Sequence, residues 1–264
     1  MLTVETYANM AEAAGAVGDR ARYLGGGTLV MQGVNYGDQS FDRVVRCREV
    51  DRDIRSESGG IRIGAGATMA DILASHEVEF LHQVARRIGG PAIRNMATVG
   101  GNLFAQNPYG DLTTALLALD AQVLRIGSGP EPIESFLSGR SRPRGLVEAV
   151  VVPRVSSGEF RFAKVSRVKP KGASTLCLAV WLRGGGRPSD PRIAWGNMGP
   201  TPLRAKAAER ALNGASLDEA GIAPVLAVAT DGLDPQDDAL ASAWYRREVA
   251  AVHLKRLLLR QGVR

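Results

Sequence analysis

The chain has 264 residues, of which 45% are hydrophobic, 23% charged and 5% aromatic, a composition typical of a globular protein with one large domain or two smaller ones. The formal net charge is +6, but its arginines are spread along the chain and form no basic stripe with aromatic residues, which excludes nucleic acid as the expected partner. No apolar run approaches the roughly 20 residues that span a bilayer and residues 1–19 do not resemble a secretory signal, so we expect a cytoplasmic protein without a transmembrane segment.

The N-terminal region is predicted to mix short helices and strands. Alanines at helical spacing predict a helix over Glu5–Val17. A short strand over Ala21–Leu24 then leads into a run of three glycines and a threonine, and the chain is expected to continue as a helical turn over Thr28–Gly33. A further strand is predicted over Arg43–Val45.

A second block of mixed structure begins near Ser56. Residues Ile61–Gly64 alternate as in a strand. The sequence Thr68-Met69-Ala70-Asp71 has the form of a capping box, in which a hydroxyl and a carboxylate bind the free amides at a helix start. The remaining elements predicted here are a helix through Phe80, Val84 and Ile88 that ends at Gly89-Gly90-Pro91, a helix over Leu112–Leu119, and strands over Gln122–Ile126 and Val147–Val152.

The C-terminal region follows a linker over residues 153–158. Three antiparallel strands are predicted over Phe160–Val168, Thr175–Arg183 and Arg192–Met198, with three glycines connecting the last two. The rest is predicted to be helical, over Ala205–Leu212, Leu217–Val228 and Ser242–Leu259. In the last helix, Tyr245, Val249, Val252 and Leu259 are expected to form the apolar side.

Two glycine-rich turns, over residues 24–29 and 97–103, are the candidate binding segments. Consecutive glycines allow positive φ and let a ligand approach the backbone closely, and successive amides can form a nest for phosphate oxygens. Thr28, Thr98 or Asn102 would add a side-chain donor. A single turn of this kind is more often a plain tight turn than a binding site. When two such turns occur in the same region, a pyrophosphate-binding site and a pair of plain turns are equally good interpretations.

The familiar nucleotide-binding motifs are missing from the sequence. A Rossmann fingerprint that begins at Gly25 would need a glycine where Val30 stands. No GxxxxGK[ST] phosphate loop occurs. A bound dinucleotide would therefore be held by a fold other than the doubly wound one.

The residues that could bind a metal are few and scattered. Cys47 and Cys177 are the two cysteines, and the three histidines are far apart in the sequence. An iron–sulfur cluster needs four thiolates, or two thiolates and two histidines. We therefore assign no metal ligand and no catalytic residue to this chain, and any metal chemistry must come from another chain.

Three stretches, read together, resemble one family of flavoproteins. They are Tyr23–Leu29, Ile61–Thr68 and Ile93–Leu103, the last followed by Pro108, Asp111 and the apolar run 116–121. This combination is similar to the FAD-binding, or medium, subunit of the xanthine dehydrogenase and carbon monoxide dehydrogenase family, the molybdenum hydroxylases. The resemblance continues through Phe162–Arg167, Pro200–Ala205 and Ser242–Arg247, so it covers essentially the whole chain.

The resemblance implies an α+β architecture. We expect a vanillyl-alcohol-oxidase-type FAD-binding fold made of two α/β subdomains, at about residues 1–55 and 56–155. A C-terminal domain, with a three-stranded antiparallel sheet and helices, is expected over residues 159–264.

The resemblance also implies which residues contact FAD. The two glycine-rich loops would hold the pyrophosphate, Asp111 would accept hydrogen bonds from cofactor hydroxyl or amino groups, and Lys164 would stabilise negative charge on the reduced flavin. Without the resemblance, Asp111 would be read as an exposed acid at a helix start and Lys164 as a surface lysine. The full set is Leu24, Gly25, Gly26, Gly27, Thr28, Leu29, Val30, Met31, Thr98, Val99, Gly100, Gly101, Asn102, Asp111, Val147 and Lys164.

The function that the resemblance implies is an electron relay in an oxidoreductase complex. A large subunit with a molybdopterin–molybdenum cofactor would hydroxylate the substrate, and a small subunit with [2Fe–2S] clusters would pass the electrons to FAD on this chain and then to an external acceptor. The expected assembly is a heterotrimer, as a dimer of heterotrimers. Many relatives carry an aspartate shortly after the arginine that matches Arg167, whereas this chain has Val-Lys-Pro-Lys. The resemblance therefore does not imply which molecule accepts the electrons.

Two alternatives remain open at this point. One is a self-sufficient flavin oxidoreductase of the same fold superfamily, which would need its own substrate pocket with an acid or base. The other is a flavin-free assembly or binding protein whose loops have lost the cofactor.

Overall fold

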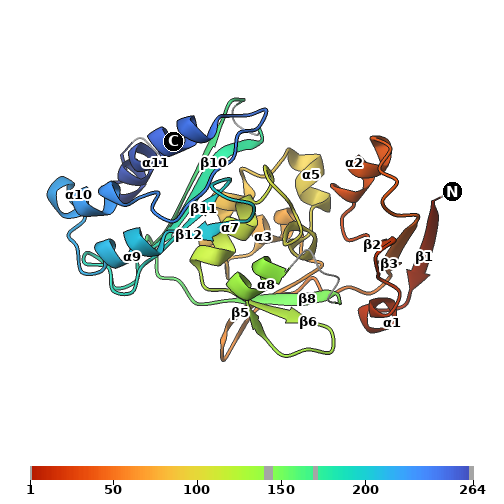
Figure 1. Ribbon diagram of the computed structural model, residues 1–264. Coiled ribbons are helices and arrows are strands. Elements are labelled where there is room, and N and C mark those ends of the chain that lie inside the picture. Colours follow the sequence, from red (N-terminus) through yellow and green to blue (C-terminus); the bar gives the residue numbers. More distant parts are fainter. Residues whose placement is uncertain (1, 140–144, 169–171, 262–264) are drawn as a thin grey trace. The chain divides into compact units, whose positions relative to one another are not determined.

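The computed structural model, drawn as a ribbon in Figure 1, describes residues 2–139, 145–168 and 172–261. The chain divides into two compact units. Unit 1 consists of Met1–Ala105 and Asp120–Arg154, and unit 2 of Gln106–Leu119 and Val155–Arg264. The segment Gln106–Leu119 thus folds with unit 2, although it lies between two parts of unit 1 in the sequence. Residues 169–171, which belong to the stretch after Arg167, lie outside the described residues.

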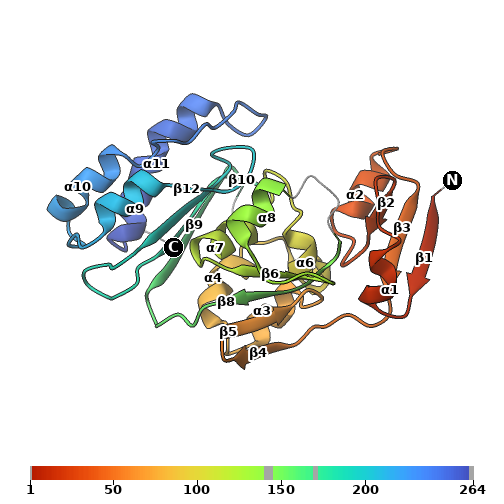
Figure 2. The same cartoon turned by 60° about the horizontal axis from the view of Figure 1, so that its bottom comes forward.

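The first sheet of unit 1 has three parallel strands in the order β1-β3-β2. These are β1 (Thr3–Tyr7), β2 (Ala21–Tyr23) and β3 (Arg43–Cys47). Helices α1 (Met10–Ala14) and α2 (Val30–Asn35) make the crossovers that parallel strands require (Figure 2). The predicted helix over Glu5–Val17 is therefore wrong in its first part. Pairing with β3 draws Thr3–Tyr7 into a strand, and the Asn9 side chain caps a shorter helix.

The second sheet of unit 1 has five strands in the order β4-β5-β8-β6-β7, and every neighbouring pair is antiparallel. The strands are β4 (Ile54–Glu57), β5 (Gly60–Gly64), β6 (Gln122–Arg125), β7 (Glu131–Pro132) and β8 (Val147–Val152). All residues of β5 are buried. Strands β5, β6 and β8 confirm predicted strands.

Short helices complete unit 1: α3 (Met69–Ala74), η1 (Glu79–Leu81), α4 (His82–Ala85), α5 (Pro91–Met96), α6 (Val99–Asn102) and α8 (Ile133–Gly139). The predicted capping box at Thr68 and Asp71 is confirmed, with both reciprocal hydrogen bonds present. The helix predicted through Phe80, Val84 and Ile88 ends early, at Ala85. The glycine-rich turn that was expected after it contains α5 and α6.

The sheet of unit 2 has four antiparallel strands in the order β12-β11-β10-β9, not the three that were predicted. Strands β9 (Phe160–Ser166), β10 (Ser174–Trp181) and β11 (Arg192–Gly196) match the prediction. The additional strand β12 (Leu203–Arg204) has two residues, which pair with Ala194 and Trp195 of β11. Two residues are too few to produce an alternating pattern in the sequence, and only the pairing reveals this strand.

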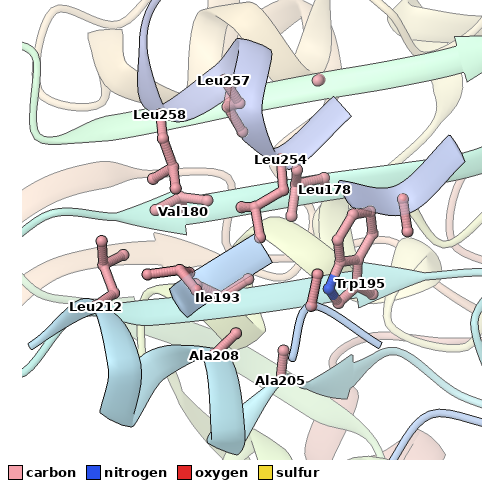
Figure 3. Packing of buried hydrophobic residues seen from close by; sticks show 14 of the residues in the cluster. Leu178, Val180, Ile193, Trp195, Ala205, Ala208, Leu212, Leu254, Leu257 and Leu258 are labelled. Atoms are coloured by element: carbon pink, nitrogen blue, oxygen red, sulfur yellow. The ribbon is translucent and has the colours of Figure 1, made fainter. Parts of the chain in front are cut away.

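Three helices cover one face of this sheet: α9 (Lys206–Leu212), α10 (Glu219–Ala227) and α11 (Ala243–Leu258). Figure 3 shows Leu178, Val180, Ile193 and Trp195 of the sheet packed against leucines of α11 and against Ala208 and Leu212 of α9. Alternate strand residues point to this face, and their large apolar side chains form the core of unit 2. Within residues 2–139, 145–168 and 172–261, no helix has the length and apolar composition needed to cross a bilayer.

The buried side of α11 differs from the predicted one. Tyr245 and Val252 are exposed, whereas Arg246, Ala250 and Leu254 are buried. The Arg246 guanidinium lies inside unit 2 because it donates hydrogen bonds to the carbonyl oxygens of Thr175, Gln236 and Ala241 and to the carboxylate of Asp238. A buried arginine whose N–H donors have four acceptors can take the place of an apolar residue on the packed side of a helix. The spacing of apolar residues in the sequence cannot reveal such a position.

Helix α7 (Asp111–Ala118) packs on the other face of the same sheet, and all eight of its residues are buried. Lys164, Cys177 and Gly196 are neighbours across β9, β10 and β11 and share this face. A Cβ at Gly196 would overlap the Cys177 sulfur and the Thr114 hydroxyl. The glycine therefore allows α7 to lie directly on the strands.

Candidate cofactor site

The first glycine-rich loop leaves its backbone donors free. The amide of Leu24 donates to Val45 O at 2.7 Å, which ends the pairing of β2. In the described part of the chain, the next four amides, from Gly25 to Thr28, donate no hydrogen bond. Gly27 has a φ of +72°, which bends the chain into α2, and Leu29 at the start of that helix provides no side-chain cap. The loop therefore presents consecutive unpaired N–H groups.

The second glycine-rich loop differs, because the amides of Val99, Gly100 and Gly101 are already engaged. Val99 and Gly100 donate to Ala67 O and Ala65 O at 2.7 and 2.9 Å. The amide of Gly101 donates to Oγ1 of Thr98 at 3.1 Å, which caps the short helix α6. The side-chain amide of Asn102, expected to bind the ligand, donates to Thr98 O at 2.8 Å. This loop contributes a fixed backbone surface instead of a second set of free amides.

The two loops lie against each other within unit 1. A Cβ at Gly26 would overlap the carbonyl oxygen of Met96, and one at Gly25 would lie 2.8 Å from Oγ1 of Thr98. Gly26 is therefore a glycine because the second loop approaches it closely, a reason that the sequence did not reveal. A Cβ at Gly101, by contrast, would meet only the Thr98 hydroxyl within 4 Å, at 3.0 Å, and this residue is exposed.

The segment after β5 holds the second loop in place. Thr68 and Thr98 form an isolated antiparallel bridge, and a Cβ at Gly100 would lie 2.9 Å from the Ala65 Cβ. The Ala65 amide donates to Glu148 O at 2.9 Å, which places Val147, at the start of β8, one residue from this contact. All three stretches that carry the family resemblance in this region thus lie together, and Val147 is close to them.

This arrangement fits the diphosphate group of FAD. A pyrophosphate carries negative charge on oxygens that accept hydrogen bonds, and unpaired amides in a glycine-rich loop are its usual protein partners. The four free amides of residues 25–28 are donors of this kind, and Gly27 and Gly101 leave the nearby backbone without side chains. The donor set therefore agrees with the cofactor that the resemblance implied.

The two remaining predicted residues, Asp111 and Lys164, lie in unit 2 and pair with each other. The Lys164 Nζ is 2.6 Å from Oδ2 of Asp111. Their side chains are 6% and 3% exposed, so the readings as a surface lysine and an exposed helix-start acid are both wrong. Asp111 does begin α7, as the pattern predicted, but the helix is buried along with it.

Two further polar residues lie beside this ion pair. Ser174, the first residue of β10, is fully buried and donates from Oγ to Oδ1 of Asp111 at 2.5 Å. The Cys177 thiol donates to the Thr114 hydroxyl at 3.4 Å, and burial raises the pKa of this thiol well above its ordinary value. The sequence reasoning missed Ser174 entirely, since a single serine at a strand end carries no recognisable signal.

Comparison with known proteins identifies the family. Residues 1–155 match the family described as the FAD binding domain in molybdopterin dehydrogenase. This chain belongs to that family. Residues 161–261 match the CO dehydrogenase flavoprotein C-terminal domain, so a second flavoprotein family model covers much of unit 2.

Several relatives of this flavoprotein are similar over nearly the whole chain. The glyceraldehyde dehydrogenase medium chain of Sulfolobus acidocaldarius is 27% identical, with 89% of this chain and 88% of the relative covered. The carbon monoxide dehydrogenase medium chain of Afipia carboxidovorans is 26% identical, with coverages of 94% and 91%. The putative xanthine dehydrogenase FAD-binding subunit of Escherichia coli is 27% identical, with coverages of 94% and 89%.

Solved structures have the same fold. A carbon monoxide dehydrogenase from Hydrogenophaga pseudoflava, which lacks the Mo-pyranopterin moiety of its cofactor, matches with a TM-score of 0.84, 25% identity and coverages of 97% and 96%. A reconstituted CO dehydrogenase from Oligotropha carboxidovorans matches with a TM-score of 0.86, 24% identity and coverages of 99% and 97%. The predicted family, FAD as its cofactor, the oxidoreductase class and the α+β fold class are confirmed, apart from the number of strands in unit 2.

Proposed function

We propose that this flavoprotein is the FAD-carrying, electron-transfer subunit of a molybdenum hydroxylase complex. It receives electrons from [2Fe–2S] clusters on a small partner subunit and passes them to an external acceptor. The substrate is hydroxylated on a large partner subunit that binds the molybdopterin–molybdenum cofactor. The assembly is a dimer of heterotrimers in the cytoplasm.

The observation that carries this proposal is the set of free amides in the first loop. A hydrogen-bonded β-turn pairs the amide of its fourth residue, whereas none of the four consecutive amides from Gly25 to Thr28 has an acceptor in the described part of the chain. Unpaired backbone donors in a partly buried loop are unusual unless a ligand or solvent accepts from them. The loop is also held firmly, because the Met96 carbonyl lies against Gly26.

The residues of this chain bind and orient the cofactor. The amides of residues 25–28 would hold the diphosphate, and the exposed backbone at Gly101 would leave room for the cofactor. When bound, FAD supplies the capacity to exchange electrons singly and in pairs. The roles of Val147, Asp111 and Lys164 toward the cofactor, and the domain boundaries at residues 155 and 159, are part of the same proposal.

The partner subunits follow from the relatives and from the composition of this chain. The similar chains of Sulfolobus acidocaldarius and Afipia carboxidovorans are medium chains, a name that implies larger and smaller companions. Among the described residues, no group of three or more histidine, cysteine, aspartate or glutamate side chains could hold a metal ion. Iron–sulfur clusters in a complex of this kind would therefore lie on another chain.

The first test is the cofactor content of the purified full-length protein. The wild-type chain should show the visible absorption of bound flavin, and Gly101→Val should lose it because the added side chain covers the backbone that FAD approaches. Gly15→Val is the matched control, since Gly15 is an exposed αR residue with nothing within 4 Å of an added Cβ. It should retain the flavin.

The outcomes separate the proposal from its rivals. A colourless wild-type protein that does not bind added FAD would support the flavin-free assembly protein. A lone chain that oxidises a small substrate at full rate would support the self-sufficient oxidoreductase. Co-purification from the native source with two other polypeptides, one of which contains molybdenum, is the result expected for the subunit.

A further inference from the structure

The connection between the two sheets of unit 1, residues 48–53, leaves the first sheet and joins the second within a few residues. The amide of Glu49 still donates to Ala8 O, just after β1, at 3.0 Å. Two residues later, Asp51 O already accepts the amide of Gly66, just after β5, at 2.8 Å. Val50 alone separates these two attachments in the sequence. The point at which Asp51 is held on the second sheet therefore determines where the first sheet lies.

Two glycines after and within β5 allow the connection to lie directly on the backbone. A Cβ at Gly64 would overlap Asp51 O, and one at Gly66 would lie 2.7 Å from Cγ1 of Val50 and 2.8 Å from Asp51 O. The amide of Gly64 also donates to Asp53 O, at 2.9 Å. These contacts explain why the stretch Ile61–Thr68, which carries part of the family resemblance, has glycines at both positions.

Arg62 of β5 is a buried cation at this contact. Its side chain is 8% exposed. Its guanidinium donates to the carboxylate of Asp51 and, at 2.8 Å, to Oε1 of Glu148 on β8, and its Nε lies 4.0 Å from Oε1 of Glu57. Hydrogen bonds between ions are strong where water is largely excluded. Arg62 thus fastens the connection to two strands of the second sheet.

Contacts from the connection and from β5 extend to both glycine-rich loops. Val50 and Tyr23 both pack against the apolar core of the first sheet, and the first loop follows Tyr23 directly in the chain. On the other side, Ala65 O accepts the amide of Gly100 in the second loop at 2.9 Å. The first loop is therefore attached through the connection, and the second loop through the residue between the two glycines.

We propose that Arg62 is a positioning residue that holds the first glycine-rich loop beside the second, an inference that rests on the proposed function. It acts by fixing Asp51 on β5 and not by contact with the cofactor. Without the guanidinium, the carboxylates of Asp51, Glu57 and Glu148 remain as neighbouring like charges, which repel each other. The connection then leaves β5, the first sheet shifts with it, and the free amides of residues 25–28 no longer meet the diphosphate.

The experiment measures the dissociation constant for FAD of the full-length chain, at a temperature at which each variant is folded. Arg62→Met should raise this constant about tenfold, the loss expected when one hydrogen bond to a charged phosphate is no longer made. Arg55→Met is the matched control, because Arg55 lies 3.8 Å from the same carboxylate of Asp51 and its side chain is 47% exposed. This variant should change the constant less than about twofold.

Hydrogen exchange of the FAD-free protein separates positioning from overall stability. In Arg62→Met, the amides of Gly64 and Gly66, which donate to the connection, should exchange about tenfold faster. The amide of Leu24 donates to Val45 O inside the first sheet, at 2.7 Å, and should keep its rate. Equal acceleration of all three amides would mean that Arg62 stabilises unit 1 as a whole, and this result overturns the inference.

Variants of Asp51 test the route of the effect. Asp51→Asn should also weaken FAD binding, and it tests the inference even if Arg62→Met does not fold. If the arginine acts through Asp51, the double variant Arg62→Met/Asp51→Asn binds FAD no more weakly than Arg62→Met alone. Additive losses, or an unchanged constant in the folded variants, overturn the inference while the proposed function stands. A wild-type chain that binds no FAD overturns the proposed function and this inference together.

Discussion

The buried ion pair between Lys164 and Asp111 should contribute strongly to the stability of unit 2. Replacement of Lys164 by methionine removes the cation and leaves a carboxylate that is 3% exposed, with Ser174 as a remaining donor. Removal of one partner of a buried pair costs about 3–5 kcal/mol, because the other charge stays uncompensated in a medium of low polarity. We expect Lys164→Met to lower the free energy of unfolding by this amount.

An exposed ion pair of the same unit provides the matched control. The Lys255 Nζ lies 2.9 Å from Oε1 of Glu219, and the two side chains are 37% and 69% exposed. Exposed pairs contribute only about 0–1 kcal/mol, since water solvates each charge when the other is removed. Lys255→Met should therefore be nearly neutral. The two variants differ in burial and share the same chemical change.

The assay is urea denaturation of the FAD-free protein, followed by tryptophan fluorescence. The three tryptophans, at positions 181, 195 and 244, all belong to unit 2, so the signal reports on the unit that contains the ion pair. Without FAD, cofactor binding does not contribute to the measured stability. In the double variant Lys164→Met/Asp111→Asn neither charge of this pair remains, and most of the loss should be recovered. Equal costs for Lys164→Met and Lys255→Met, or a double variant as unstable as the sum of its single changes, would refute the reasoning.

Two other predictions concern the loops and the long helix. Gly26→Ala should lower FAD retention, and it should reduce the free energy of unfolding of the FAD-free protein by about 1–3 kcal/mol through overpacking. The cause is that the added Cβ overlaps the Met96 carbonyl oxygen. An unchanged melting temperature would show that the loops do not meet there. Burial and the nearby Arg256 lower the pKa of His253 below its ordinary value of 6.5, so the unfolded chain binds more protons below that pH and stability is lost on acidification. His253→Gln should therefore reduce the fall in melting temperature between about pH 7.5 and about pH 5.5, and an identical fall in both proteins would contradict this.

The elements that were predicted correctly are those whose signal is local. The capping box at Thr68 and Asp71 needs only four consecutive residues, and both of its hydrogen bonds form. Strand β8 was predicted with the correct ends because four of its six residues are valines, which favour strands. Strand β1 was missed because its structure comes from pairing with β3, about 40 residues away, which overrides the alanine-rich spacing.

The predicted site shows the same division in more detail. The two loops could be selected because consecutive glycines are visible in the sequence and because the family resemblance spans them. Their unequal roles were not visible, since free and engaged amides differ only in the acceptors that the fold brings near. The second loop finds its acceptors at Ala65, Ala67 and Thr98, whereas the first loop finds none among the described residues.

The sequence by itself determined the family, the expected cofactor and the positions of the glycine-rich loops, because these depend on residues that are close together in the chain. Only the tertiary structure decided which polar groups are buried and with what they pair. Asp111 and Lys164 are 53 positions apart, and Asp111 and Ser174 are 63 apart. Burial and pairing of such residues arise when α7 packs on the sheet of unit 2, and no local pattern records that event.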